Sequence, residues 1–91
     1  MNEKQLLKEW LVEALVALNG SGTIVEVCEI VWKLHEKDLK RSGDLYYTWQ
    51  YDIRWAATKL RKDGIIEYAE LSPKGVWELV QSYYAKFASI P

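Results

Sequence analysis

Four side chains between residues 50 and 61 have types and spacing suited to contact with the edges of bases in double-stranded DNA. They are Gln50, Arg54, Thr58 and Arg61. Separations of four, four and three residues would place them in one stripe along a helix. Glutamine and arginine carry paired hydrogen-bonding groups that match adenine and guanine in the major groove. If the segment is helical, the stripe predicts direct readout of bases.

Basic and tyrosine side chains near this stripe predict contacts with phosphate and sugar, which position a protein on DNA without reading its sequence. The expected backbone contacts are Lys40, Arg41, Tyr47, Tyr51, Lys59, Lys62 and Lys74. Two carboxylates, Asp52 and Asp63, lie in the same region and would repel phosphate. Such repulsion would be avoided only if a cation such as Arg54 or Lys59 neutralised them.

The distribution of charge along the chain supports a DNA contact in this region more strongly than the net charge of the whole chain does. The formal net charge is −1 and the isoelectric point is about 5.8, so the whole chain is not attracted to phosphate at long range. Residues 40–62 carry six Lys/Arg and two Asp/Glu, which gives +4. Residues 1–39 carry four Lys/Arg and seven Asp/Glu, which gives −3. Residues 63–91 carry two Lys/Arg and four Asp/Glu, which gives −2. The basic excess is confined to the expected DNA-contacting segment.

Three helices are predicted to position the stripe. Leu7, Trp10 and Leu11 begin an apolar pattern with spacings of three and four, which Asn19-Gly20 should end. Asn2 and Gln5 resemble a capping box before it, and Thr23 and Glu26 form a T-x-x-E box before a second helix that ends near Lys40 or Arg41. A third helix should run from about Leu45 or Thr48 to Asp63, with Gly64 as its C-cap. Its predicted inward face is Trp49, Ile53, Ala56, Ala57 and Leu60.

A β-hairpin is predicted after the third helix. Ile65, Ile66 and Tyr68 suit one strand, residues 72–75 (Ser-Pro-Lys-Gly) suit a turn, and residues 76–80 suit the returning strand. Residues 81–89 are predicted to form a short helix. The chain is therefore expected to be mainly α with a small β-hairpin. This order is typical of a winged helix-turn-helix: a three-helix core, a wing of two to three strands and a short C-terminal helix, in one domain spanning residues 1–91.

Three segments resemble the winged-helix domain at the amino terminus of Mrr-type restriction proteins. They are GSGTIVEVCEIV, DIRWAATKLRKDGII and KGVWELV, and the resemblance spans roughly residues 5–80. In that family the wing commonly has Arg-Gly-Val-Trp, and Lys74 replaces the arginine here, which keeps the charge but loses the planar fork. The resemblance implies DNA binding, with the third helix in the major groove and the wing on the backbone. The family's downstream nuclease domain has no counterpart in this sequence, so cleavage is not implied.

Catalytic and metal-binding patterns are absent from the sequence. Cys28, the one cysteine, lies in a helical apolar pattern and is predicted to be a small buried hydrophobe. His35, the one histidine, is predicted to lie at the surface. One histidine and one cysteine do not supply a metal site, and no glycine-rich phosphate loop or nucleophile elbow occurs. We expect no enzymatic activity, no cofactor, no metal and no small-molecule substrate.

The sequence also predicts where the protein acts. No segment approaches the roughly 18 to 20 apolar residues of a membrane span, and the first ten residues are too charged for a signal peptide. A cytoplasmic protein without a membrane partner is expected.

The aromatic residues allow a second interpretation of what this protein binds. The five tryptophans are predicted mostly to build the core, whereas Tyr46, Tyr47 and Tyr51 cannot all be buried. We expect a homodimer, with Trp10 and the aromatic residues of 83–87 as its surface. The leading prediction is a double-stranded DNA-binding protein, acting as a transcriptional regulator or as an accessory of a restriction or defence system. The alternative is a winged-helix module that docks proteins and does not bind DNA.

Overall fold

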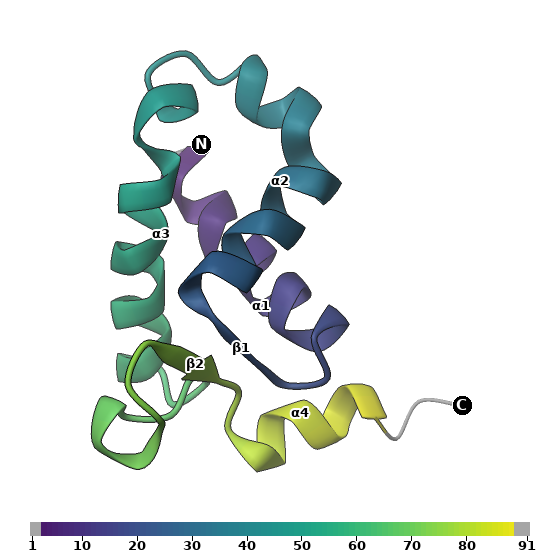
Figure 1. Ribbon diagram of the computed structural model, residues 1–91, viewed down its shortest axis with the longest axis vertical. Helices are drawn as coiled ribbons and strands as arrows, with labels where there is room; N and C mark the ends of the chain where they lie inside the picture. The colour runs from purple at the N-terminus through teal and green to yellow at the C-terminus, as the bar shows by residue number, and fades with distance from the viewer. Residues whose placement is uncertain (1–2, 89–91) are drawn as a thin grey trace.

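Helices account for most of residues 3–88, the part of the chain that this computed structural model describes (Figure 1). A short 3-10 turn, η1 (Glu3–Gln5), leads into α1 (Leu6–Ala17), β1 (Ser21–Thr23), α2 (Ile24–Lys40) and α3 (Leu45–Lys62). A second 3-10 turn, η2 (Ala69–Leu71), is followed by β2 (Val76–Glu78) and α4 (Gln81–Ala88). The chain is therefore mainly α with a small antiparallel sheet. The expected capping box at Asn2 and the predicted helix end at Ser89 lie outside the described residues.

The predicted helix boundaries are confirmed by their capping groups. At the start of α2, the Glu26 N–H donates to Thr23 Oγ1 at 3.1 Å, and the Thr23 N–H donates to Glu26 Oε1 at 2.8 Å. This reciprocal pair satisfies two N–H groups that the helix leaves unbonded. Asn19 and Gly64 follow α1 and α3 with φ of 63° and 76°, the left-handed conformation that ends a helix.

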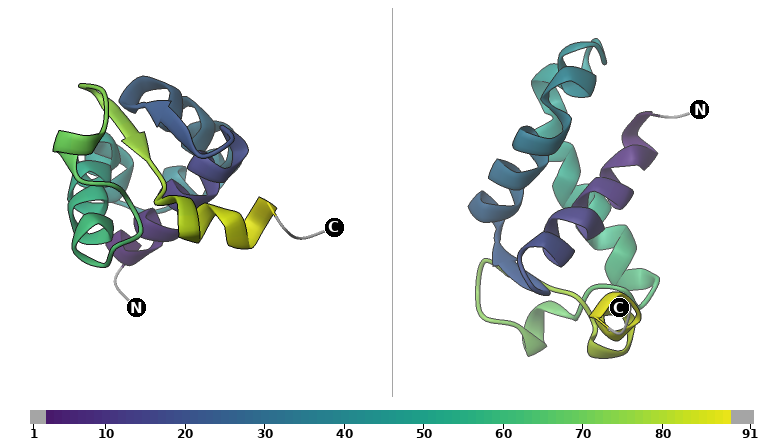
Figure 2. Two further views of the ribbon diagram at one scale, coloured as in Figure 1. Left: turned by 90° about the horizontal axis from the view of Figure 1, so that it is seen from below. Right: turned by 90° about the vertical axis from the view of Figure 1, so that its right-hand side faces the viewer.

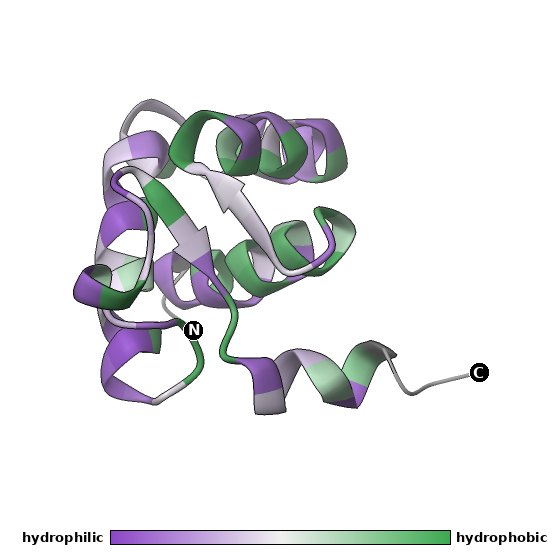
Figure 3. Ribbon diagram, turned by 60° about the horizontal axis from the view of Figure 1, so that its bottom comes forward, coloured by the Kyte–Doolittle hydropathy of each residue, from purple (hydrophilic) through white to green (hydrophobic). Residues whose placement is uncertain are grey.

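One hydrophobic core joins the helices to the sheet, and the predicted inward face of α3 is buried in it as expected. Three of the five tryptophans are buried, and Trp32 and Trp55 are half-buried. Apolar and hydrophilic residues alternate around each helix (Figure 3). The buried residues are Leu7, Trp10, Leu11, Ala14, Leu15, Val27, Val31, Leu39, Leu45, Trp49, Ile53, Ala56, Ala57, Leu60, Ile66, Trp77 and Leu79.

The predicted hairpin is confirmed in part: antiparallel contacts join residues 65–67 to residues 78–80, but the ladder of β2 is formed with β1, which was not predicted. The antiparallel register places Ser21 opposite Glu78 and Thr23 opposite Val76. Ile66 forms a bridge with Leu79, flanked by hydrogen bonds from the Glu67 N–H to the Glu78 carbonyl at 2.9 Å and from the Val80 N–H to the Ile65 carbonyl at 2.8 Å. The three extended residues between α1 and α2 supply the ladder for β2, and the chain after residue 68 turns into η2 instead of continuing as a strand.

The ends of the fold have different surroundings. The turn between α2 and α3 lies at one end of the molecule, and the sheet lies at the other end beside the start of α2 (Figures 1 and 2). From the end with the sheet, α4 projects away from the other helices (Figures 1 and 3). One long side of α3 is therefore left without a covering helix.

Candidate nucleic-acid interface

The uncovered side of α3 carries an arc of polar, basic and aromatic side chains without a carboxylate. With about 100° of rotation per residue, these side chains fall within about 120° of the helix circumference. We call this set the α3 arc: Tyr47, Gln50, Tyr51, Arg54, Thr58, Arg61 and Lys62. The helix has four cations and one carboxylate, Asp52, and so a formal charge of +3. Asp52 lies outside the arc.

Three of the four predicted base-reading residues are exposed on the α3 arc. Gln50 and Arg54 form no side-chain hydrogen bond or ion pair within residues 3–88. The Thr58 hydroxyl donates to the carbonyl of Arg54, one turn earlier, at 3.1 Å. Tyr47 and Tyr51 are 83% and 78% exposed. The arrangement leaves an amide and a guanidinium available to a ligand.

Arg61, the fourth predicted base-reading residue, is half-buried and has a structural contact. Its Nε donates to the carbonyl oxygen of Glu67 at 3.1 Å, which ties the end of α3 to the segment beyond Gly64. Because a guanidinium has five N–H donors, the remaining donors still have capacity for another partner. Arg61 is therefore both an anchor of the fold and a weaker candidate for base contact than Arg54.

Lys40 and Arg41 lie at the turn between α2 and α3. Lys40 Nζ donates to Glu36 Oε2 at 2.7 Å, a contact that raises the pKa of the Lys40 ammonium. The same nitrogen lies 5.9 Å from the centroid of the Trp32 ring. Arg41 is exposed and follows the last residue of α2. A carboxylate of its own helix thus compensates the charge of Lys40.

The flank of α3 opposite Gln50 is occupied by the N-terminal segment of the chain. Lys59 is nine residues from Gln50, about half a turn around the helix, and its Nζ lies 5.8 Å from the Trp55 ring centroid. Asp52 accepts a hydrogen bond from the Thr48 hydroxyl at 2.7 Å and pairs with Lys4 at 3.7 Å. The cation beside Asp52 is therefore Lys4, because η1 lies against this flank, and neither Arg54 nor Lys59 pairs with Asp52 within residues 3–88.

The segment between Ile66 and β2 is the one in which the sequence predicted a wing, and residues 67–75 are called the wing loop below. Its end is tied to α2, since the Ile24 N–H donates to the Gly75 carbonyl at 3.2 Å. Lys74 is exposed, as its predicted contact with the DNA backbone requires. The loop also carries Glu67 and Glu70, so its formal charge is −1. Its exposed apolar residues are Tyr68, at 61% and predicted in a strand, and Leu71, at 67% and not singled out from the sequence.

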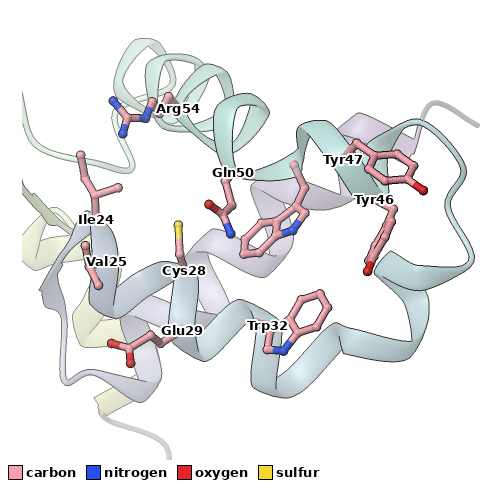
Figure 4. Close-up of a pocket in the computed structure, with 10 residues that line it drawn as sticks. Ile24, Val25, Cys28, Glu29, Trp32, Tyr46, Tyr47, Gln50 and Arg54 are labelled. Carbon is pink, nitrogen blue, oxygen red and sulfur yellow. The ribbon is translucent and has the colours of Figure 1, made fainter.

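A groove of about 770 Å³ lies between α2 and α3 (Figure 4), and sequence analysis missed it. Its lining residues are Ile24, Val25, Cys28, Glu29, Trp32, Tyr46, Tyr47, Trp49, Gln50 and Arg54. Val25, Cys28 and Trp32 are spaced by three and four, so the sequence did contain a signal: an apolar stripe beside the one assigned to the core. The groove joins this stripe to two members of the predicted base-reading set.

Cys28 belongs to this groove and is only half-buried, which corrects its predicted place in the core. Burial raises the pKa of the Cys28 thiol, and the positive charge of Arg54 lowers it by a smaller amount. The thiol is thus a reporter of the groove's occupancy.

Two surface predictions on the other side of the molecule are wrong. Trp10, expected on a dimer surface, is 8% exposed, and its ring stacks on His35 with centroids 4.2 Å apart. His35, expected at the surface, has a side chain that is only 16% exposed, with Nε2 2.5 Å from Glu13 Oε1 and Nδ1 3.6 Å from Asp38 Oδ2. The backbone of His35 departs from helical values, and this kink turns the ring towards α1.

Within residues 3–88, no three or more histidine, cysteine or acidic side chains converge in the manner of a metal site. In the same range, every helix is too short or too polar to traverse a lipid bilayer. A comparison with protein-family models found no matching family, and searches of curated proteins and of solved structures found no match either.

Proposed function

We propose that this chain is a winged helix-turn-helix protein that binds double-stranded DNA, with α3 in the major groove and the wing loop on the backbone. The observation that carries the proposal is the α3 arc, which combines hydrogen-bonding and cationic side chains and excludes every carboxylate of the helix. The major groove of B-form DNA admits an α-helix, and phosphates on both sides disfavour acidic groups near it.

The role of each residue in the proposed interface follows from its exposure and from whether it has an interaction partner within the chain. Gln50, Arg54 and Thr58 contact base edges, and Arg61 adds a contact from the end of the helix. Exposed cations and tyrosines contact the backbone: Arg41, Tyr47, Tyr51, Lys62 and Lys74. Lys40 and Lys59, which have partners within the chain, contribute mainly through their charge.

The order of the elements supports the same proposal. Three helices are followed by the wing loop and β2, and β1 between α1 and α2 completes the sheet. In helix-turn-helix proteins the second helix of the motif enters the groove while the first crosses the backbone. A cytoplasmic transcriptional regulator, or an accessory of a restriction or defence system, would use such a domain without any catalytic group.

The test is fluorescence anisotropy of a labelled 25-base-pair duplex, titrated with the protein at several salt concentrations. The logarithm of affinity should fall linearly with the logarithm of salt, with a slope of about 0.9 per neutralised phosphate. A protein that shows no binding even at low salt would exclude DNA as the partner.

Pairing of two copies through α4 is part of the proposal. A groove of about 610 Å³ between α1, α4 and the end of α3 has apolar lining residues that include Val12, Val16 and Phe87, which is 37% exposed. Its charged lining residues are Lys8, Glu9, Glu13 and Asp63. A two-fold dimer would present its reading helices to half-sites about one helical turn of DNA apart. Sedimentation velocity at micromolar concentrations measures this directly, and a monomer mass throughout the range would remove the dimer.

A docking module for proteins is the second candidate, and the wing loop favours it. Tyr68 and Leu71 are three residues apart across a 3-10 turn, so both side chains lie on the same side of the loop. Exposed apolar pairs of this kind are common in protein interfaces, and Glu67 and Glu70 would repel phosphate. If Y68S/L71S leaves duplex affinity within twofold, Tyr68 and Leu71 do not contact DNA and are free for a protein partner.

A further inference from the structure

We propose that the groove between α2 and α3 binds a purine base, stacked on Trp32 and held at its edge by Gln50 and Arg54. Two sources supply this chemistry: a base extruded from duplex DNA, or a free purine nucleotide. The first source rests on the proposed function, and the second does not.

The size and composition of the groove fit a planar heteroaromatic ligand. Its volume of about 770 Å³ falls within the range of about 300 to 1,000 Å³ that small-molecule sites occupy. Apolar side chains form most of the lining on the α2 side, and the polar groups of Gln50 and Arg54 come from α3 (Figure 4). A few polar groups around an apolar surface are what fix the orientation of a ring.

Trp32 is the stacking surface. Its ring is half-buried and packs near two other aromatic rings, Trp49 at 6.3 Å between centroids and Tyr46 at 6.4 Å. Trp49 is only 4% exposed, so it holds the indole of Trp32 from the core side. A ring fixed in this way loses little freedom when a base stacks on it, and stacking tolerates any base.

The preference for purines comes from α3. The Gln50 side chain is directed into the groove, and the Arg54 side chain lies at its end beside Ile24 (Figure 4). A glutamine amide pairs with N6 and N7 of adenine, and an arginine pairs with O6 and N7 of guanine or with a phosphate. The one carboxylate of the lining, Glu29, makes no ion pair with Arg54 within residues 3–88. Both recognition groups are therefore without an internal partner.

Cys28 makes the inference testable on the unmodified protein, because it is the single cysteine and lines the groove. Its alkylation by N-ethylmaleimide, followed by mass spectrometry, should slow when a base covers it. The probes are AMP, a 25-base-pair duplex with one unpaired adenine, and the same duplex fully paired. We expect AMP or the bulged duplex to slow alkylation at least about fivefold more than the paired duplex does. The bulged duplex should also bind about tenfold more tightly, as one base–aromatic stack allows.

A matched pair of variants assigns the effect to the groove. Trp32→Leu should abolish the advantage of the bulged duplex and the protection by AMP. Trp55→Leu removes an equally half-buried indole from the opposite flank of α3 and should preserve both effects. If Trp32→Leu does not fold, the protection of Cys28 from alkylation in the wild-type protein still tests the proposed base site.

Each outcome separates the two sources and the two proposals. Protection by AMP supports a free nucleotide, and protection by the bulged duplex alone supports an extruded base. Equal protection by paired and bulged duplexes, or none by any probe, overturns the inference, while salt-dependent binding of the paired duplex would leave the proposed function standing. AMP protection without duplex binding would retain the base site and overturn the proposed function.

Discussion

The two flanks of α3 carry similar residue types and differ in whether those residues have partners. On the flank facing the N-terminal segment, Asp52 is bonded to Thr48 and paired with Lys4, and Lys59 lies over Trp55. On the flank facing α2, Gln50 and Arg54 border an open groove and have no partner within residues 3–88. Groups with internal partners stabilise the fold, whereas groups without them keep their hydrogen-bonding capacity for a ligand. The presence of an internal partner therefore separates charges that stabilise the fold from charges that could bind a ligand more sharply than residue type does.

The largest effect we predict comes from reversing one charge on each flank. Arg54→Glu should weaken duplex binding by about tenfold to a hundredfold, because it removes a base contact worth about 1–3 kcal/mol and adds a repelled carboxylate. Lys59→Glu makes the same change in net charge and should cost only about threefold to fivefold. Anisotropy at one fixed salt concentration measures both. Equal losses would show that binding follows net charge and not the α3 arc.

Truncating one aromatic residue on each side of α3 should separate effects on the free energy of unfolding from effects on duplex binding. Trp55→Ala removes a half-buried indole and should lower the free energy of unfolding by about 2 kcal/mol. Tyr51→Ala, on a residue that is 78% exposed, should change it by less than about 0.5 kcal/mol but should weaken duplex binding. Urea denaturation and anisotropy measure the two quantities. A strongly destabilised Tyr51→Ala would contradict its place on the free surface.

Neutralising the single carboxylate of α3 should have a small effect on stability and almost none on binding. Asp52→Asn loses the ion pair with Lys4 but keeps a hydrogen-bonding group for Thr48, so we expect a loss of about 0.5 kcal/mol or less. The difference should shrink at high salt because this pair is partly exposed, with 38% of the Lys4 side chain accessible, and is therefore screened. Duplex affinity should stay within twofold. A clear gain in affinity would mean that Asp52 faces the DNA after all.

The smallest effect concerns the thiol in the groove. Burial raises the pKa of Cys28 and Arg54 partly offsets this, so Arg54→Gln should raise the pKa further. Less thiolate then forms at pH 8, and alkylation should slow by about twofold to threefold. The difference should vanish at a pH high enough to ionise the thiol fully in both proteins. Lys59→Gln is the control, and an equal slowing there would show that Arg54 does not act on Cys28 locally.

Local features of the fold were predictable because they depend on near neighbours in the chain. The Thr23–Glu26 capping box needs only two residues three positions apart, and the left-handed ends at Asn19 and Gly64 need only one residue each. The buried face of α3 follows from a spacing of three and four. Pairing across distance was not predictable in this way: β2 pairs with β1, more than 50 residues earlier in the chain.

The candidate site shows the same division between features set by spacing along the chain and features set by tertiary packing. The spacing of Gln50, Arg54 and Thr58 was enough to place them on one exposed stripe, since helix periodicity alone decides which side chains share a face. Arg61 satisfies the same spacing, but a carbonyl on the segment beyond the helix engages it. The groove at Cys28 required two helices to lie side by side, and no periodicity within either helix specifies that distance.

What this sequence determined by itself is the set of helices, their capping and the residue types on each face of α3, because these depend on rotation per residue and on contacts within a turn. What only the tertiary structure decided is which face meets a partner inside the molecule. The N-terminal segment lies along one flank of α3 and pairs Asp52 with Lys4, while α2 lies beside the other flank and leaves Gln50 and Arg54 over a groove. The cause is physical: packing of the shared apolar core sets the directions of these elements, and the polar groups at its edge are paired or left free as a result.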